Sequence, residues 1–326
     1  MIQTFAEWDE QEILLLSLPH ENTDWSPYLG EILDAYENLI RAISPYQKIL
    51  LIAPQKRDFD RFRKFCNVKF AQIPTNDTWI RDYGAIDIVK NNQKISLDFK
   101  FNAWGGKFEA NLDNCVNLKL FEKLKRPLKQ VNLELEGGSI DFNGRGVMLT
   151  TTQCLLNPNR FHTDKDALDR KLKEIFGLER IIWLDHGFIL GDDTDSHIDT
   201  LARFIDENTI AYAACDDKND LHYSELKSME NELKKTGFNL VPLFIPRAIF
   251  YQNRRLGATY CNFIFVNNAL ILPSYGDEKY DEMAKFNLEN AIKNRDIIQV
   301  RSEVFLRQNG SLHCSSQNVF KFKGKK

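Results

Sequence analysis

The feature that most constrains this fold is a recurring order of a strand pair, a helix and a further strand. Pairs of short apolar or alternating segments flank loops rich in Asn, Asp and Gly, a pattern typical of β-hairpins. The hairpins predicted in this way are residues 85–89 with 94–99, 139–142 with 147–152, 200–205 with 209–215, and 262–266 with 269–273. The sequence therefore predicts a chain built from a repeated structural unit.

Each predicted hairpin is followed by a segment with helical periodicity and then by a short strand. The helical segments are 112–124, 163–176, 221–236 and 277–293, and the strands after them are 130–135, 180–185, 239–245 and 296–302. The N-terminal part is expected to hold a strand at 12–19, a helix at 27–44, a strand at 48–54 and a second helix at 55–66. Pairing of strand 12–19 with residues 316–322 would complete a fifth unit.

Five such units predict an α/β fold in which a ring hides the sheet edges, as in propellers. A doubly wound sheet would show single strands and helices in alternation, which this chain does not. We therefore expect one catalytic domain spanning residues 1–326, a five-bladed α/β propeller of ββαβ units with pseudo-fivefold symmetry.

Composition excludes several classes of protein. With 43% apolar and 27% charged residues the chain has the composition of a globular domain. A net charge of −3 gives no basic surface for nucleic acid. No apolar run approaches the ~18 residues of a membrane span, and the N-terminal residues show no signal peptide. Six widely spaced cysteines favour reduced thiols and a cytoplasmic location. A homodimer is compatible with the sequence.

Polar residues recur at the start of each predicted hairpin. They are Asp82, Glu136, His197, Asn262 and Cys314, at successive separations of 54, 61, 65 and 52 residues. We expect His197 and Asp199 on the edge of a strand, where residues two apart face the same side. If the units close into a ring, the same point of each unit faces the axis. The predicted catalytic group is therefore Asp82, Glu136, His197, Asp199 and Cys314.

A thiol beside an imidazole is a nucleophile with its acid–base partner. Carboxylates around a thiol raise its pKa, so three of them are expected only if the substrate is itself a cation. A guanidinium fits, because it offers five N–H donors to carboxylates. We hypothesise that Cys314 attacks the guanidinium carbon, that His197 protonates departing ammonia, and that His197 then activates water to release a ureido product.

Several stretches resemble the agmatine deiminase branch of the peptidylarginine deiminase/agmatine deiminase family, within the guanidino-group-modifying (pentein) superfamily. The matching stretches are residues 75–84, 101–108, 136–138, 193–199, 202–204 and 310–314. The resemblance implies a five-unit α/β propeller and hydrolysis of agmatine to N-carbamoylputrescine and ammonia, through a covalent thiouronium on cysteine, in putrescine and polyamine biosynthesis. Gly84-Ala85 and Ser196 depart from the family pattern.

The same resemblance implies the role of each matching residue, and no cofactor. Cys314 would be the nucleophile and His197 the general acid and base. Asp82 and Asp199 would bind the guanidinium, and Glu136 would hold both the substrate and His197. Trp79 would shape the substrate slot, and Gly310 lies in the stretch that ends at Cys314.

The acidic run before His197 bears on the rest of the substrate. Asp192, Asp193 and Asp195, with Thr194 between them, suit the distal ammonium of agmatine, and Asp193 or its neighbour is predicted to contact it. The predicted substrate-binding group is Trp79, Asp193, Thr194, Asp195 and Gly310. Arg81 and Arg203 would suit a carboxylate, but each alternates with a site residue and is expected to point away. Peptidyl-arginine remains the alternative substrate.

Other interpretations stay open from the sequence alone. His197 and Asp199 are two potential metal ligands, but no second histidine pair stands at a metal-ligand spacing, so no metal site is predicted. A Cys–His amidase of another class and an inactive amine-binding relative are the remaining alternatives. The segment 104–107 is either a mobile flap or a loop around a buried indole. His313 is expected on the face opposite Cys314, and the other five cysteines in the core.

Overall fold

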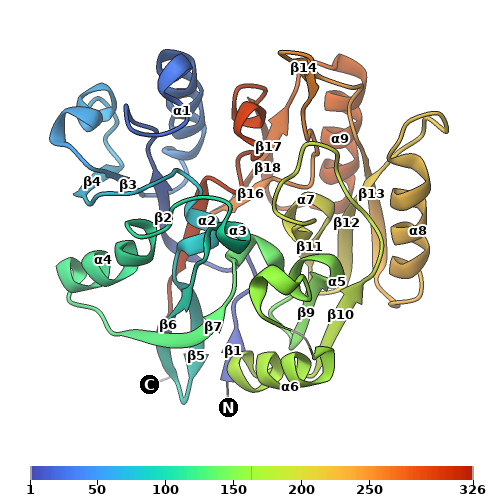
Figure 1. The fold of residues 1–326 in the computed structure, drawn as a ribbon, viewed down its shortest axis with the longest axis horizontal. Helices are drawn as coiled ribbons and strands as arrows, with labels where there is room; N and C mark the ends of the chain where they lie inside the picture. Colours follow the sequence, from blue (N-terminus) through green and yellow to red (C-terminus); the bar gives the residue numbers. More distant parts are fainter. Residues whose placement is uncertain (1, 163, 325–326) are drawn as a thin grey trace.

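The computed structural model describes residues 2–162 and 164–324, which form a mixed α/β fold (Figure 1). All four predicted hairpins are present as antiparallel pairs. They are β5 (Ile86–Lys90) with β6 (Gln93–Lys100), β8 (Ile140–Phe142) with β9 (Val147–Thr151), β11 (Ala202–Asp206) with β12 (Thr209–Ala214), and β16 (Ile264–Val266) with β17 (Ala269–Ser274). The turn residues therefore located each hairpin correctly.

A third strand joins each hairpin, parallel to the hairpin's second strand. These strands are β7 (Leu128–Glu134), β10 (Arg180–Leu184), β13 (Asn239–Phe244) and β18 (Asp296–Arg301). A parallel neighbour requires a crossover, which the intervening helical segments supply. The repeated order of hairpin, helix and strand is thus confirmed.

The two ends of the chain share one sheet, as predicted. β19 (Ser316–Phe320) pairs antiparallel with β2 (Gln11–Ser17), and β3 (Ile49–Ala53) and β4 (Val68–Gln72) continue that sheet in parallel. β4 was not predicted, because only Val68 and Ala71 of its residues are buried. Two further short features were also missed: β1 (Ile2–Thr4), which pairs with β5, and the hairpin of β14 (Phe250–Tyr251) and β15 (Arg254–Arg255).

The longer helices lie around the outside of the molecule, with the sheets inside them (Figure 1). They are α1 (Leu29–Ile43), α4 (Val116–Leu124), α6 (Lys165–Phe176), α8 (Tyr223–Leu233) and α9 (Glu278–Ala291). Each buries one stripe against the sheets; in α1 the stripe includes Ile32, Tyr36 and Leu39. The start of α6 predicted at Thr163 lies outside the described residues, and Asp164 caps the helix by accepting from the Ala167 amide.

The segment predicted as a second helix at 55–66 is shorter than expected. It forms a 3-10 helix, η2 (Lys56–Phe62), which opens with a capping box between Gln55 and Asp58. Phe59 and Phe62 are buried, but Phe65 is only partly so and Cys66 is exposed. The prediction of a buried Cys66 was therefore wrong, because the chain has already left the helix there. Cys115 and Cys215 are likewise only half-buried.

Short helical turns connect the sheets to one another. They are η1 (Ser26–Tyr28), α2 (Ile80–Tyr83), α3 (Ala103–Gly106), η3 (Asp113–Cys115), η4 (Gly137–Ser139), α5 (Thr152–Leu155), η5 (Pro158–Arg160), α7 (Ile198–Leu201) and η6 (Phe305–Gln308). Three of them, α2, η4 and α7, lead directly into β5, β8 and β11. Among the described residues, no helix combines the length and apolar character needed to cross a membrane.

Candidate active site

The five residues predicted to meet come from the turns that precede the hairpins. Asp82 lies in α2, Glu136 immediately precedes η4, His197 and Asp199 belong to the start of α7, and Cys314 lies in a turn before β19. The expectation that His197 and Asp199 share one face of a strand edge was wrong. Both belong to a single helical turn, which is too short to leave a periodic signal in the sequence.

Gly138 allows three of these side chains to converge. A Cβ atom at this position would lie 2.6 Å from His197 Nδ1, 2.7 Å from Asp82 Oδ1 and 3.1 Å from Asp199 Oδ2. Any side chain there would push these groups apart. Cys314 Sγ lies 3.8 Å from Asp199 Oδ2. Ligand atoms of Glu136 and His197 lie within 4.8 Å of each other, which completes the predicted group of five.

The carboxylate of Asp82 is held by two N–H donors. Trp104 Nε1 donates to Oδ2 at 2.9 Å and the Gly138 amide donates to Oδ1 at 2.9 Å. His197 Nδ1 lies 3.6 Å from Oδ1, beyond hydrogen-bond distance. The indole of Trp104 is buried, and its backbone is left-handed at φ 56°. Of the two interpretations of segment 104–107, the structure has the buried indole.

His313 contacts the site, contrary to the sequence prediction. Its Nδ1 lies 2.7 Å from Asp199 Oδ2, and its Nε2 lies 2.8 Å from Glu7 Oε2. Cys314 is not on a strand, so the rule that adjacent residues face opposite sides does not apply. The His313 ring therefore bridges the carboxylates of Asp199 and Glu7.

Asn262 positions the turn that carries the thiol. Its Oδ1 accepts from the His313 amide at 2.9 Å, and its Nδ2 lies 3.2 Å from Cys314 Sγ. The sequence spacing had marked Asn262 as the equivalent point of its unit, without giving it a role. Because Asn262 lies beside Cys314, the spacing had also indicated a fifth residue of the site.

Arg160 is a site residue that sequence reasoning missed. It is fully buried, and its Nε donates to Glu136 Oε1 at 3.0 Å while Nη2 donates to the Thr194 carbonyl at 2.9 Å. Its Nη1 pairs with Asp195, which also binds Lys107 at 3.1 Å. Asp195 therefore holds Arg160 instead of facing the substrate cavity as predicted. An arginine in a polar loop gives no sequence signal of this role.

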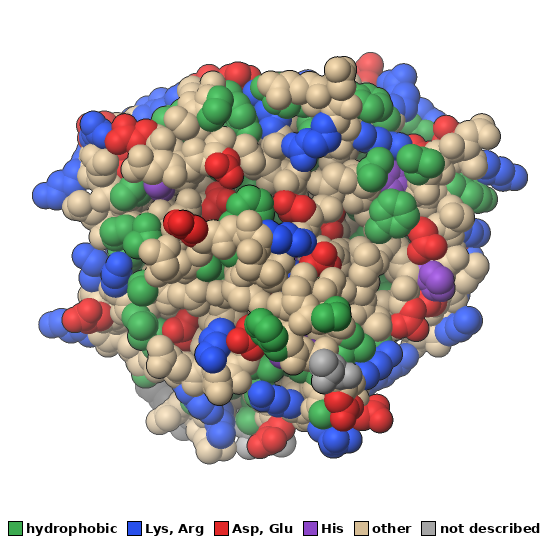
Figure 2. Space-filling model, in the orientation of Figure 1, with side chains coloured by type: hydrophobic (Ala, Val, Ile, Leu, Met, Phe, Trp, Pro, Cys, Tyr) green, Lys and Arg blue, Asp and Glu red, His purple; other side chains and the backbone are tan. Residues whose placement is uncertain are grey.

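A cavity opens onto Cys314 and Asp82. Its other lining residues are Asp24, Asp77, Trp79, Trp104, Phe108, Asp193, Thr194, Gln308, Asn309 and Gly310. Of the predicted substrate-binding residues, Trp79, Asp193, Thr194 and Gly310 line it. A Cβ at Gly310 would lie 2.4 Å from the Trp79 ring, so the glycine lets the indole approach. Acidic side chains gather near the middle of this face of the molecule (Figure 2).

Arg81 and Arg203 do not line this cavity, as expected. Arg81 donates to the side chains of Gln317 at 2.8 Å and Asn318 at 2.7 Å. Arg203 donates to Asp141 at 2.7 Å and pairs with Glu7. Within the described residues, the cavity lining therefore contains carboxylates and no arginine or lysine, which favours a cationic ligand.

Burial and like charge keep the Cys314 thiol and the His197 imidazole uncharged in the absence of a ligand. Burial, Asp199 and Asp82 raise the pKa of the Cys314 thiol well above its usual value. Burial, Asp199 and Glu136 do the same to the pKa of Asp82. Burial lowers the pKa of His197 to about 3. The thiol is thus protonated and the imidazole neutral, and a bound cation would shift both the Cys314 and Asp82 pKa values downward.

Asp199 behaves differently from Asp82. Burial acts against its charge, yet the hydrogen bond and positive charge of His313 outweigh burial and lower its pKa. The pKa values of the two carboxylates are therefore shifted in opposite directions, that of Asp199 downward and that of Asp82 upward. Such a separation of pKa values within one buried group is typical of functional sites.

Comparison with known proteins agrees with this geometry. The family described as Porphyromonas-type peptidyl-arginine deiminase matches residues 3–319. This chain belongs to that family. A Legionella pneumophila protein named putative agmatine deiminase is 30% identical over 96% of this chain and 93% of its own length. The agmatine deiminase of Medicago truncatula is 27% identical over 96% of this chain and 94% of its own.

Solved structures in the family share the whole fold. A C. jejuni agmatine deiminase, solved as a cysteine-to-serine variant with substrate bound, is 60% identical, with a TM-score of 0.98 over 99% of this chain and 97% of its own. A putative arginine deiminase from Porphyromonas gingivalis is 33% identical, with a TM-score of 0.93 over 100% of both chains. The family, and with it the mixed α/β fold, is thus established across the full length.

Proposed function

We propose that this protein is an agmatine deiminase, a hydrolase that converts agmatine and water to N-carbamoylputrescine and ammonia. The observation that carries the proposal is a protonated thiol among buried carboxylates at the end of an acidic cavity. Such a site lacks only a positive charge, which a guanidinium supplies. The names of the C. jejuni, Medicago and Legionella relatives support the same substrate.

The geometry supports a reaction in two stages. The bound guanidinium, held by Asp82 and Asp199, lowers the pKa of the Cys314 thiol, which gives its proton to His197. Sulfur attacks the guanidinium carbon, and the imidazolium protonates the amine that leaves as ammonia. His197 then takes a proton from water, whose oxygen attacks the thiouronium carbon. The carbon–sulfur bond breaks, and the thiol regains its proton as the ureido product leaves.

The mouth of the cavity favours agmatine over an arginyl peptide. Asp24, Asp77 and Asp193 line it together. Burial and the neighbouring acids Asp24 and Asp193 raise the pKa of Asp77 to about 7. An ammonium would relieve this repulsion, whereas a carboxylate would add to it. Peptidyl-arginine is the second candidate, favoured by the name of the matching family.

The remaining features of the proposal concern the whole chain. We infer that the five repeated units close into a five-bladed α/β propeller forming one catalytic domain over residues 1–326. Five of the sheets have the order that such units require. All six cysteines are free thiols, which supports a reducing, cytoplasmic location. A homodimer and independence from nucleic acid and cofactors are part of the same proposal.

Ureido product and ammonia should be measured with agmatine, arginine and an arginyl peptide. We expect the largest kcat/KM with agmatine, and a fall of about 10⁴-fold or more in Cys314→Ala. Cys261→Ala, which removes a buried thiol outside the cavity, is the matched control. Activity that survives in Cys314→Ala would overturn the mechanism, and preference for the peptide would overturn the substrate. Loss of activity on chelation would favour a metal-dependent reaction instead.

A further inference from the structure

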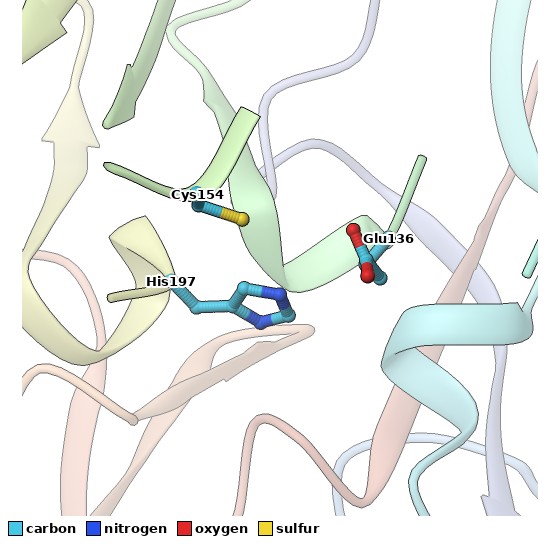
Figure 3. Close-up of side chains that lie close together, drawn as sticks. All are labelled: Glu136, Cys154 and His197. Carbon is cyan, nitrogen blue, oxygen red and sulfur yellow. The ribbon is translucent and has the colours of Figure 1, made fainter. Parts of the chain in front are cut away.

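A second buried thiol lies next to the imidazole of His197. Ligand atoms of Glu136, Cys154 and His197 all lie within 4.8 Å of one another, and all three residues are buried. Figure 3 shows the Cys154 sulfur and the Glu136 carboxylate pointing toward the ring of His197. Cys154 is in α5, Glu136 precedes η4 and His197 begins α7. Three separate turns thus deliver three potential metal ligands to one point.

Two of these side chains have polar atoms without partners. Among the described residues, Glu136 Oε2 and both ring nitrogens of His197 accept or donate no hydrogen bond, although Glu136 is 1% exposed and His197 is fully buried. Buried polar atoms are normally hydrogen bonded, so these atoms are available to a ligand. In the proposed reaction one ring nitrogen of His197 at a time exchanges a proton, and Cys154 takes no part in that reaction.

We propose that Glu136, Cys154 and His197 form a binding site for a thiophilic divalent cation such as Zn²⁺. One thiolate, one imidazole and one carboxylate are zinc ligands, and three protein ligands leave the fourth position open. Mg²⁺ and Ca²⁺ prefer oxygen ligands alone and do not suit this set. Within residues 2–162 and 164–324 no other group of this kind brings three ligand atoms so close.

Charge balance favours the bound state. Arg160 and Lys107 balance the charges of Glu136 and Asp195. Among the three ligand side chains themselves, the Glu136 carboxylate supplies one negative charge. Binding replaces the thiol proton of Cys154, which passes to solvent, and adds a second negative charge. A divalent cation then brings the sum to zero. A neutral buried complex avoids the desolvation cost of an uncompensated charge.

Occupation of this site would remove His197 from catalysis. A coordinated imidazole nitrogen cannot exchange protons with sulfur, ammonia or water. Cys154 does not line the substrate cavity, so the cation would act through His197 and lower kcat. The metal site itself does not depend on the proposed function. Only the inhibition does, and the two are measured separately below.

Cobalt(II) is the probe, because a cysteine thiolate bound to it gives a near-ultraviolet charge-transfer band. The whole chain should be titrated anaerobically with Co²⁺, followed by competition with Zn²⁺. We expect one equivalent to bind with a thiolate band in the unmodified protein, and no thiolate band in Cys154→Ser. Glu136→Gln should keep the band and weaken binding by about 10-fold or more. Absence of a band in the unmodified protein would overturn the proposal.

Two further cysteine variants separate this site from its competitors. Cys314→Ser and Cys261→Ser should both keep the band, since neither residue belongs to the cluster. A band that disappears in Cys314→Ser and persists in Cys154→Ser would place the cation on the nucleophile candidate and overturn the proposal. Zinc inhibition is then expressed relative to each variant's own metal-free rate. We expect it to be chelator-reversible and at least about 10-fold weaker in Cys154→Ser.

Discussion

Two groups of buried charged side chains meet at Asp199, and they differ in how completely they are paired. The thiol cluster comprises Asp82, Glu136, His197, Asp199 and Cys314. The arginine cluster comprises Glu7, Arg81, Asp141, Arg203 and His313. All of these except Arg203 line a separate cavity, which shares no lining residue with the first. Asp199 belongs to both, since His313 donates to its Oδ2 while Oδ1 is unpartnered among the described residues.

In the arginine cluster every acid faces a base. Glu7 pairs with Arg203 and His313, and Asp141 accepts from Arg203 and from the Phe204 amide. In the thiol cluster both nitrogens of His197 and one oxygen of Glu136 have no partner among the described residues. Buried polar groups are normally hydrogen bonded. The difference indicates that one cluster holds the fold and positions Asp199, while the other is completed by a ligand.

The largest effect should come from neutralising Asp82 in the thiol cluster. We expect Asp82→Asn to lower kcat/KM for agmatine by about 1000-fold, because the guanidinium loses a charged partner. The free energy of unfolding should change by less than about 1 kcal/mol. The loss of a hydrogen-bond acceptor is offset because a carboxylate no longer has to be buried. Steady-state kinetics and urea unfolding measure the two quantities. A large loss of stability would place Asp82 with the arginine cluster instead.

The matching change in the arginine cluster is Glu7→Gln, which should act in the opposite way. Breaking its pairs with Arg203 and His313 should lower the free energy of unfolding by about 3 kcal/mol. We expect kcat/KM to fall by less than about 10-fold, through the weaker hold of His313 on Asp199. A kinetic loss as large as that of Asp82→Asn would mean that the two clusters act as one.

Glu7→Gln also makes a prediction about pH. Burial opposes its charge, but Arg203 and His313 outweigh burial and depress the pKa of Glu7 below its ordinary value of 4.5. The unfolded chain therefore takes up this proton first as the pH falls, and the stability that Glu7 contributes is lost. The difference in unfolding free energy between the unmodified protein and Glu7→Gln should have its largest value above pH 4.5 and should decrease below it. Urea unfolding across this range measures it.

The protonated thiol leads to a further prediction. Burial, Asp199 and Asp82 hold the pKa of Cys314 well above its usual value, so a neutral chloroacetamide should alkylate it only in strong alkali. A chloroacetamidine of the same size carries its own positive charge, and its rate profile should lie about one pH unit or more lower. Peptide mapping by mass spectrometry follows Cys314, with the exposed Cys66 as internal reference. Identical profiles would exclude activation by the substrate cation.

Much of the fold could be predicted because its signals are local. Turn residues located the hairpins, and helical periodicity located α1, α6, α8 and α9. One further signal was the repeated position of four residues, each at the same point of its unit. It was enough to predict that they lie close together: Asp82, Glu136, His197 and Cys314. β4 was missed because it is half exposed and lacks alternation. Turns of four residues such as α2 and α7 are too short to show any period.

Partners contributed by distant loops could not be predicted. His313 was assigned to the wrong face, because the rule that adjacent residues of a strand face opposite sides was applied to residues of a turn. Arg160 gave no signal, because its role exists only when residues 136, 160 and 195 are brought together. Asp195 and Asp193 are two residues apart and equally acidic, and only the structure shows that Asp195 faces Arg160 while Asp193 lines the cavity.

The smallest effect should come from the cavity mouth, where Asp193 is placed to meet the amine of agmatine. Burial raises the pKa of Asp193, and its Oδ2 accepts from Asn309 Nδ2 at 2.7 Å. We expect Asp193→Asn to raise KM for agmatine by about 5- to 10-fold with little change in kcat, corresponding to a partly exposed ion pair of about 1 kcal/mol.

Butylguanidine, which lacks the amine, is the decisive comparison for Asp193. Its KM should be the same in the variant and the unmodified protein, because the guanidinium end is unchanged. Asp60→Asn, an exposed acid outside the cavity, controls for the change in net charge. If KM rises equally for both substrates, Asp193 shapes the cavity and does not read the amine. The preference for an amine-tailed guanidine would then have to come from Asp24 or Asp77, the other two acids at the mouth.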